Sequence, residues 1–185
     1  MLEKFSLIYE PWNVYSEVGY HATITANKES IINEGFRPSN NDDDWLGEGI
    51  YFWDDIKNAE WWNRKGNIIS GCIFICKLTC NLINYLDLDD KAEMDKLNTF
   101  SQKYVCEMSK VGRKKPVFKN YNQMKKFFCD IYCSKNDISI LSFTFKHDII
   151  NKAGFKTGTF GRRQICVREL SCISIIGIKE WFYVV

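Results

Sequence analysis

The fold of this chain is decided by GYHAT at residues 19–23, followed by WLGEGIYF at residues 45–52. Polarity alternates after Gly19, which is typical of a short strand. Asn27 is expected to cap a helix that stops at Gly35. The second stretch ends in apolar and aromatic residues, as a buried strand does. These residues predict the order strand, helix, loop, strand.

The rest of the chain predicts a single mixed α+β domain over residues 1–185. Residues 1–18 are expected to form an irregular N-terminal arm. Residues 85–155 match no pattern that we can place, and they are expected to form a helical insert or an acceptor-side region.

Apolar spacing gives a first reading of the individual elements. Helices are expected after Asp54-Asp55, where Ala59, Trp61 and Trp62 should pack inward, and over residues 89–108 and 121–133. Strands are expected over residues 68–79, 164–168 and 172–178. Residues 138–147 are ambiguous, with a helix favoured, and residues 154–161 indicate a glycine-rich turn.

Composition allows a sizeable core and leaves the class of partner open. Of the 185 residues, 45% are hydrophobic and 15% aromatic, so the chain can bury enough apolar surface to fold unaided. The net charge of +2 does not by itself argue for nucleic acid. Residues 103–126 interleave Lys and Arg with aromatic side chains, which suits phosphates and bases, although a solvated surface is the simpler explanation.

The eight cysteines are expected to be reduced and mostly buried. Spacings of four residues separate Cys72, Cys76 and Cys80, and likewise Cys129 and Cys133; neither is the CxxC spacing of zinc ligands, so no metal site is expected. The first residues show no secretion signal, and no segment has the length of a membrane span. We therefore expect a cytoplasmic protein without membrane contact.

Three groups of side chains are candidates for chemistry. His21 and Thr23 lie two residues apart, so a strand directs both to the same face. In the strand predicted at Gln164, this side chain faces away from the core, whereas Glu169 has the opposite parity. Taken alone, His21 and Tyr51 are more simply explained as an edge histidine bonded to backbone and a core aromatic residue.

Together these residues resemble the NAD site of ADP-ribosyltransferases, in the branch of the poly(ADP-ribose) polymerases and diphtheria toxin. His21-Ala22-Thr23 is similar to the H-G-T strand of that family, and residues 47–52 match its G-x-G-I-Y-F strand. Residues 164–168 resemble its third motif, with Gln164 in place of the usual Glu. The resemblance implies an α+β fold with split antiparallel sheets and helices around an NAD cleft.

The resemblance also implies a role for each site residue. His21 would hydrogen-bond the adenosine ribose, while the backbone beside it, at Ala22, holds the nicotinamide amide. Thr23 would add a hydroxyl contact on the same side. Tyr51 would stack on the nicotinamide ring, and Gly49 would allow close approach of the backbone.

Gln164 determines the reaction that the resemblance implies. A neutral Gln can hydrogen-bond a ribose hydroxyl but cannot take a proton, as a Glu would. We therefore expect transfer of one ADP-ribose from NAD to a protein or nucleic acid, with nicotinamide release, rather than polymer elongation. Glu48 and Glu169 are candidate substitutes for the missing base. Arg37 would cover the diphosphate end, although a solvated loop charge is the simpler explanation.

Other classes of function stay open on the sequence alone. The chain is either an NAD-dependent mono-ADP-ribosyltransferase, an NAD glycohydrolase, or an inactive module that binds ADP-ribose or nucleic acid. A protease-like pair of a cysteine with His21 or His147 is a further enzyme class, without supporting context. A toxin or defence effector, with an antitoxin or immunity protein as partner, is the setting implied by analogy of fold.

Overall fold

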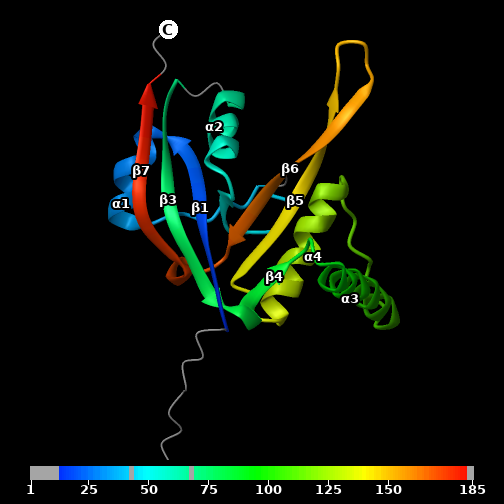
Figure 1. The fold of residues 1–185 in the computed structure, drawn as a ribbon. Coiled ribbons are helices and arrows are strands. Elements are labelled where there is room, and N and C mark those ends of the chain that lie inside the picture. The colour runs from blue at the N-terminus through cyan, green and yellow to red at the C-terminus, as the bar shows by residue number, and fades with distance from the viewer. Residues whose placement is uncertain (1–12, 42–43, 67–68, 183–185) are drawn as a thin grey trace, which may run out of the picture.

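The computed structural model describes residues 13–41, 44–66 and 69–182. Helices and strands alternate irregularly along this chain, with short 3₁₀ turns between them (Figure 1). The strands are β1 (Val14–Ile24), β2 (Ile50–Trp53), β3 (Ser70–Asn81), β4 (Tyr85–Asp87), β5 (Ile140–Ile150), β6 (Lys156–Val167) and β7 (Ile173–Phe182). The helices are α1 (Lys28–Glu34), α2 (Ile56–Lys65), α3 (Lys91–Lys110) and α4 (Tyr121–Lys135).

Three of the four described helices begin at a capping side chain. Asp55, Asp90 and Asn120 each accept a hydrogen bond from a backbone N–H in the first turn of α2, α3 and α4. Asn27 occupies the cap position of α1, but its side chain donates to Thr23 Oγ1 instead. Helices were expected at all four places, and these predictions are confirmed.

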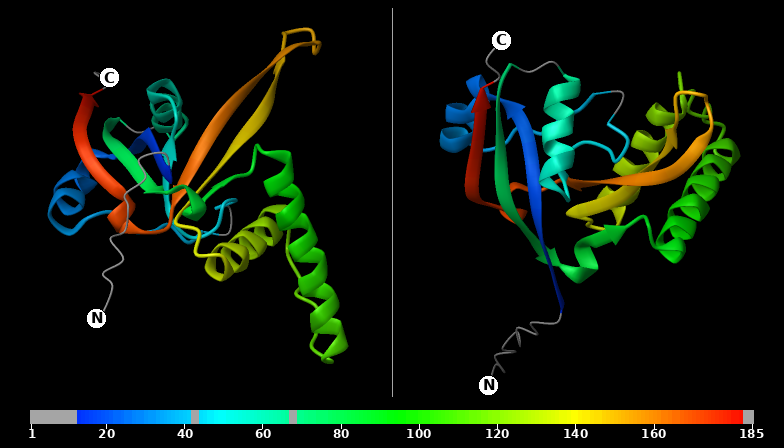
Figure 2. Two further views of the ribbon diagram at one scale, coloured as in Figure 1. Left: turned by 60° about the horizontal axis from the view of Figure 1, so that its bottom comes forward. Right: turned by 45° about the horizontal axis from the view of Figure 1, so that its top comes forward.

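All seven strands of the described residues belong to one mixed sheet, in the order β4-β5-β6-β2-β1-β3-β7. Neighbouring strands are antiparallel, except that β4 and β5 are parallel. β1 pairs with β3 along its whole length, but it shares a single registered pair with β2, Tyr20 with Trp53. The sheet therefore has two halves that meet at a narrow junction and run in different directions (Figures 1 and 2). The expectation of separate, purely antiparallel sheets is corrected in both respects.

One face of the sheet carries a core to which both halves contribute. Phe52 and Phe74 belong to the same buried cluster as Ile165 and Val167, and α1 adds Ile31 to it. The sheet thus curves around its own side chains, which holds the two halves face to face across this cluster.

The opposite face carries two clusters, one for each half of the sheet. α2 covers the β1-β3 half, where Ala59 packs in a cluster with Trp53 and Ile73. α3 and α4 lie beside the β5-β6 half, and their apolar side chains form a larger cluster with Leu141 and Cys166 (Figure 1). The two halves are therefore covered separately on this face, which leaves the junction between them accessible.

An ion pair fastens the two halves together close to the junction. Arg163 of β6 donates from Nη1 to both carboxylate oxygens of Glu17 on β1, at 2.8 Å each. Its Nη2 donates to the Tyr85 hydroxyl at 2.6 Å and to Ser142 Oγ at 3.0 Å. The Tyr15 hydroxyl donates to Glu17 at 2.6 Å. Because both charged side chains are partly removed from water and each makes several hydrogen bonds, this network should contribute more than an exposed surface ion pair.

The helix favoured over residues 138–147 is wrong, because β5 begins at Ile140. Ile140 and Leu141 are both fully buried, yet they belong to clusters on opposite faces of the sheet. A strand covered on both faces has no alternation of polarity, so its sequence pattern resembles that of a buried helix.

Three expected boundaries also move. The turn expected over residues 154–161 is shorter, because β6 begins at Lys156 and Gly161 already pairs with β5. The irregular arm gives way to β1 at Val14, and residues 1–12 lie outside the described part of the chain. Residues 85–155 supply α3 and α4 and also the sheet strands β4 and β5.

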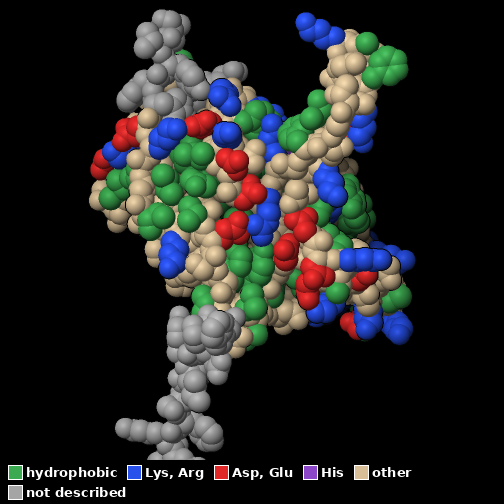
Figure 3. Space-filling view, in the orientation of Figure 1, with side chains coloured by type: hydrophobic (Ala, Val, Ile, Leu, Met, Phe, Trp, Pro, Cys, Tyr) green, Lys and Arg blue, Asp and Glu red, His purple; other side chains and the backbone are tan. Residues whose placement is uncertain are grey.

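Charge is unevenly distributed on the face shown in Figure 3. Lys and Arg side chains lie over α3, along the β5-β6 hairpin and near the upper ends of β3 and β7, while Asp and Glu side chains lie mainly over the central strands. Within the described ranges, no helix is both long enough and apolar enough to cross a lipid bilayer.

Removing the Arg163 guanidinium should destabilise the fold. Arg163→Met leaves the Glu17 carboxylate without its partner, so we expect the free energy of unfolding to fall by about 2–3 kcal/mol. Urea denaturation followed by tryptophan fluorescence measures this change. The matched control is Lys156→Met, which removes an ion pair to Asp148 whose side chains are 57% and 51% exposed. The control should cost less than about 0.5 kcal/mol; an equal loss in both variants would contradict the proposed bridging role.

Candidate functional site

A pocket of about 240 Å³ opens where β1 and β2 separate beyond their registered pair. Its walls contain six of the residues singled out from the sequence, which come from separate parts of the chain: His21, Ala22, Arg37, Gly49, Tyr51 and Gln164. Thr23 does not line the pocket, and its hydroxyl accepts a hydrogen bond from Asn27 Nδ2 at 2.9 Å. The structure thus brings the three sequence motifs to one place.

His21 is held in a defined tautomer at the inner wall of this pocket. Its Nδ1 lies 2.9 Å from the backbone oxygen of Tyr51. A carbonyl oxygen only accepts, so Nδ1 carries the proton. Burial lowers the pKa of His21 below its usual value, and the ring packs against Phe36 and Phe52. The imidazole is therefore neutral at pH 7, with Nε2 left as a hydrogen-bond acceptor.

Tyr51 is tied to the loop that precedes β2. Its hydroxyl donates to the backbone oxygen of Gly47 at 2.7 Å and accepts from the N–H of Leu46 at 3.1 Å. The ring belongs to the cluster beneath α4, and burial raises the pKa of the hydroxyl far above its usual value. Both hydrogen-bonding functions of the hydroxyl are therefore used inside the protein.

Trp62 offers the aromatic surface that was expected from Tyr51. It extends from α2 into the same pocket and is 45% exposed, contrary to the expectation that it packs inward. Trp53 lines the pocket beside it, with the two ring centroids 5.9 Å apart. An exposed indole at a pocket wall can stack on a planar ligand ring. The sequence signal for this role is the Trp61-Trp62 pair, for which the spacing predicts a core position.

Gln164 enters the pocket from β6, between Trp53 of β2 and Phe143 of β5. It lies on the same side of the strand as Cys166 and Arg168, as alternation predicts. Within the described part of the chain, its side-chain amide makes no hydrogen bond, so it is free to bind a ligand there.

The two acidic residues proposed as substitute bases do not line the pocket. Glu48 is exposed, and its backbone N–H donates to Asp130 Oδ1 at 2.7 Å. Glu169 is also exposed, beyond the end of β6. A carboxylate that the sequence analysis missed, Asp44, does line the pocket and accepts a hydrogen bond from Ser39 Oγ at 2.8 Å.

The glycines of the G-E-G stretch serve packing against the protein itself. Gly47 has a positive φ of 95°, and a Cβ there would lie 2.4 Å from Asp130 Oδ1. A Cβ on Gly49 would lie 2.5 Å from Cys166 Sγ. Arg168 holds the same turn by donating to the Glu48 carbonyl and to Asp130. The motif therefore fixes the start of β2, and with it the position of the pocket wall.

Arg37 lines the pocket, and its guanidinium also forms an ion pair with a neighbouring carboxylate. Its guanidinium pairs with Glu34 one helical turn earlier, and its side chain is 82% exposed. An exposed pair of this kind contributes little stability, so the guanidinium can exchange Glu34 for an anionic ligand at small cost.

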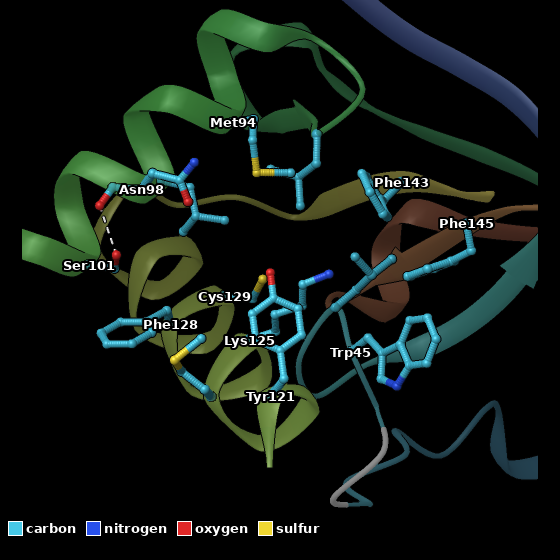
Figure 4. Close-up of a pocket in the computed structure, with 14 residues that line it drawn as sticks. Trp45, Met94, Asn98, Ser101, Tyr121, Lys125, Phe128, Cys129, Phe143 and Phe145 are labelled. Carbon is cyan, nitrogen blue, oxygen red and sulfur yellow. Dashed lines mark hydrogen bonds between the residues drawn. The ribbon is translucent and has the colours of Figure 1, made fainter. Parts of the chain in front are cut away.

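A separate apolar pocket lies between α3, α4 and β5 (Figure 4). Its walls contain Trp45 and Leu46 from the loop before β2, but not His21, Tyr51 or Gln164. Lys125 reaches across its mouth, with Nζ 4.8 Å from the centre of the Tyr121 ring and 5.3 Å from that of Phe143. Trp45 and Phe145 meet edge to face at one end of this pocket. This end therefore lies next to the junction between the two halves of the sheet.

The described cysteines are free, and most are buried, as expected. Burial raises the thiol pKa of Cys72 to about 11 and those of Cys76, Cys129 and Cys133 to about 12. Protonated thiols of this kind are poor nucleophiles. His21 Nδ1 is hydrogen-bonded to the backbone oxygen of Tyr51, and the His147 ring stacks on Phe160, so no Cys–His hydrogen bond is found among the described residues. The described residues contain no His, Cys, Asp or Glu group able to hold a metal ion.

Comparison with known proteins gives no family for this chain. Neither a scan against models of protein families nor a search of curated proteins found a match. The function must therefore be argued from the pocket itself.

The lowered pKa of His21 predicts a pH dependence of stability. The unfolded chain binds a proton at His21 near pH 6.5, whereas the folded chain binds it only at lower pH. Stability contributed by the neutral imidazole is therefore complete above about pH 6.5 and is lost as the pH falls. We expect the unfolding midpoint to drop between about pH 7.5 and about pH 5.5 more in the wild type than in His21→Asn. His147→Asn, which leaves His21 in place, is the control and should keep the wild-type drop; equal drops in all three proteins would contradict the burial of a neutral His21.

Proposed function

We propose that this protein transfers one ADP-ribose unit from NAD to a macromolecular acceptor and releases nicotinamide. The observation that carries the proposal is the meeting of His21, Trp62 and Gln164 at one pocket in the junction between the two halves of the sheet. This meeting adds spatial support to the resemblance that the sequence motifs show to ADP-ribosyltransferases.

The pocket offers each group that an NAD molecule would need. The exposed face of Trp62 suits the planar nicotinamide ring, and Nε2 of His21 can accept a hydrogen bond from a ribose hydroxyl. Ser39 and Asn41 supply further polar groups on the loop side. The exposed guanidinium of Arg37 is available to the negatively charged diphosphate. Gln164, on the opposite strand, can hold a second ribose hydroxyl through its amide.

The proposed reaction needs positioning more than acid–base chemistry. The bond between ribose C1 and the nicotinamide nitrogen breaks, and its electron pair neutralises the ring nitrogen of the leaving nicotinamide. A lone pair of the acceptor forms the new bond to the same carbon. A pocket that fixes both riboses lowers the barrier to this exchange. Because Gln164 cannot take a proton, acceptors that are already deprotonated, such as carboxylates and phosphates, are favoured; any acceptor proton passes to solvent.

The assay follows nicotinamide release while NAD labelled on the adenylate is incubated with cell protein, RNA or DNA. We expect labelled acceptor and free nicotinamide with the wild type. His21→Ala and Gln164→Ala should each lower the rate by about 100-fold, because each removes a group that positions a ribose. Gln102→Ala is the matched control, since Gln102 is an exposed residue of α3 far from the pocket lining, and it should leave the rate unchanged.

The outcomes of this assay separate the remaining classes of function. Nicotinamide release without labelled acceptor would indicate an NAD glycohydrolase. No release with any acceptor would contradict enzymatic activity and leave a binding module as the account. A loss in Gln102→Ala equal to that in Gln164→Ala would show that the pocket is not the site of reaction.

A further inference from the structure

A second pocket, of about 410 Å³, adjoins the first on the side of the sheet that α2 and α4 cover. The two pockets share Trp53, Trp62 and Gln164. Gln164 therefore stands at their border. The proposed function requires NAD to occupy the first pocket. An acceptor bound in the second pocket would then reach the nicotinamide–ribose bond from the side of Gln164.

The second pocket is unusually aromatic. Four of the six tryptophans in the chain line it, together with Phe145. Two of them, Trp61 and Trp62, follow each other on α2, with ring centroids 6.2 Å apart. Such walls give the largest binding free energy to planar ligands that stack on them, because each ring offers a flat apolar face and loses little side-chain freedom on binding.

Its charge is wholly basic. Lys65 and Arg162 line the pocket with His147, and no Asp or Glu is among the lining residues. The Lys65 ammonium lies 5.3 Å from the centre of the Trp61 ring and 5.7 Å from that of Trp62. Cations held over indole rings stay available to an anion that binds beside them.

Arg162 lies among aromatic rings without an anionic partner in the described part of the chain. Its central carbon lies 3.5 Å from the centre of the Trp61 ring and 4.4 Å from that of Phe160. Within the described residues it forms no ion pair, and its buried Nε has no hydrogen-bond partner. Arg163 beside it is fully paired with Glu17. An unpaired cation between aromatic rings indicates that an anionic ligand completes this site.

We propose that the second pocket binds a nucleotide of single-stranded nucleic acid, and that this strand is the acceptor of the proposed reaction. Trp62 lines both pockets, so the base would stack on it from the second pocket while nicotinamide stacks on it from the first. The phosphate would pair with Lys65 and with Arg162, which lies over the Trp61 ring. A duplex keeps its bases stacked inside, so it cannot use the aromatic walls. An acidic peptide would satisfy the cations but would leave the tryptophan faces without ring partners, which is why we favour nucleic acid.

A path for the rest of the strand leads away from this pocket. Asn122, in the first turn of α4, lines it. The loop just before α4 carries Arg113, Lys114 and Lys115, all exposed. A strand that extended from the pocket along this loop would meet these cations, which could then contact phosphates that flank the bound nucleotide.

The test measures binding of fluorescein-labelled single-stranded RNA and DNA oligonucleotides to the full chain by fluorescence anisotropy, without NAD. Arg162→Gln and Trp62→Ala should each weaken binding by about tenfold, because each removes a charge contact or a stacking face. Arg64→Gln is the matched control: Arg64 is an exposed cation on α2, next to Lys65, and does not line the pocket. It should leave binding unchanged, and the same oligonucleotides annealed into duplexes should compete poorly.

Two further variants keep the test informative. If Arg162→Gln does not fold, as its thermal unfolding would show, Lys65→Gln replaces it, because Lys65 is exposed. Exchanging Arg113, Lys114 and Lys115 for Gln should weaken binding and reduce its salt dependence, by about 0.7 in the slope of log affinity for each lost phosphate contact. An unchanged slope would remove the flanking loop from the proposed path.

Failure of this inference is distinguishable from failure of the proposed function. Nicotinamide release from NAD without oligonucleotide binding would overturn the nucleic-acid pocket alone. Binding that Arg64→Gln weakens as much as Arg162→Gln would overturn it as well, since only general surface charge would then be at work. Labelling confined to protein, and unaffected by Arg162→Gln, would show that the acceptor is a protein.

Discussion

The single registered pair between β1 and β2, Tyr20 with Trp53, is the constraint on which the rest of the structure depends. A longer ladder would close the sheet at this point, and no pocket would form between the strands. The ion pair of Arg163 with Glu17 makes the short ladder sufficient, because it links the two halves by side chains instead of backbone hydrogen bonds. The core cluster that both halves share supplies the remaining attachment.

The chemistry of the pocket follows from this arrangement. Where the ladder between β1 and β2 stops, His21 makes one hydrogen bond to the backbone oxygen of Tyr51. This hydrogen bond fixes its neutral ring at the pocket wall. Tyr51 and the two glycines before it are used to hold the turn into β2. What stays free for a ligand is Nε2 of His21, an exposed tryptophan, the Gln164 amide, the Arg37 guanidinium and a few polar loop groups. Such a site favours orientation and stacking of a substrate over proton transfer.

Much of the fold and of the site could be predicted from local sequence signals. Helix caps such as Asp55 and Asn120 act within one turn, so their effect is readable without knowledge of tertiary structure. β5 could not be predicted, because Ile140 and Leu141 are buried by different layers that only the folded chain brings together. For the same reason the sequence pattern predicted a core position for Trp62, which is exposed at the pocket wall. Whether an aromatic ring faces a core or a pocket depends on which helix lies over it, and the residue type does not record that.

The central claim is that NAD occupies the gap between the two halves of the sheet, and hydrogen exchange measured with and without a non-hydrolysable NAD analogue tests it most directly. The account predicts slower amide exchange at residues 21–22 and 49–53, which line the pocket in the gap, with α3 and α4 unchanged. It also predicts that His21→Ala abolishes this protection. Protection confined to the apolar pocket between α3 and α4, or no protection anywhere, would contradict the account.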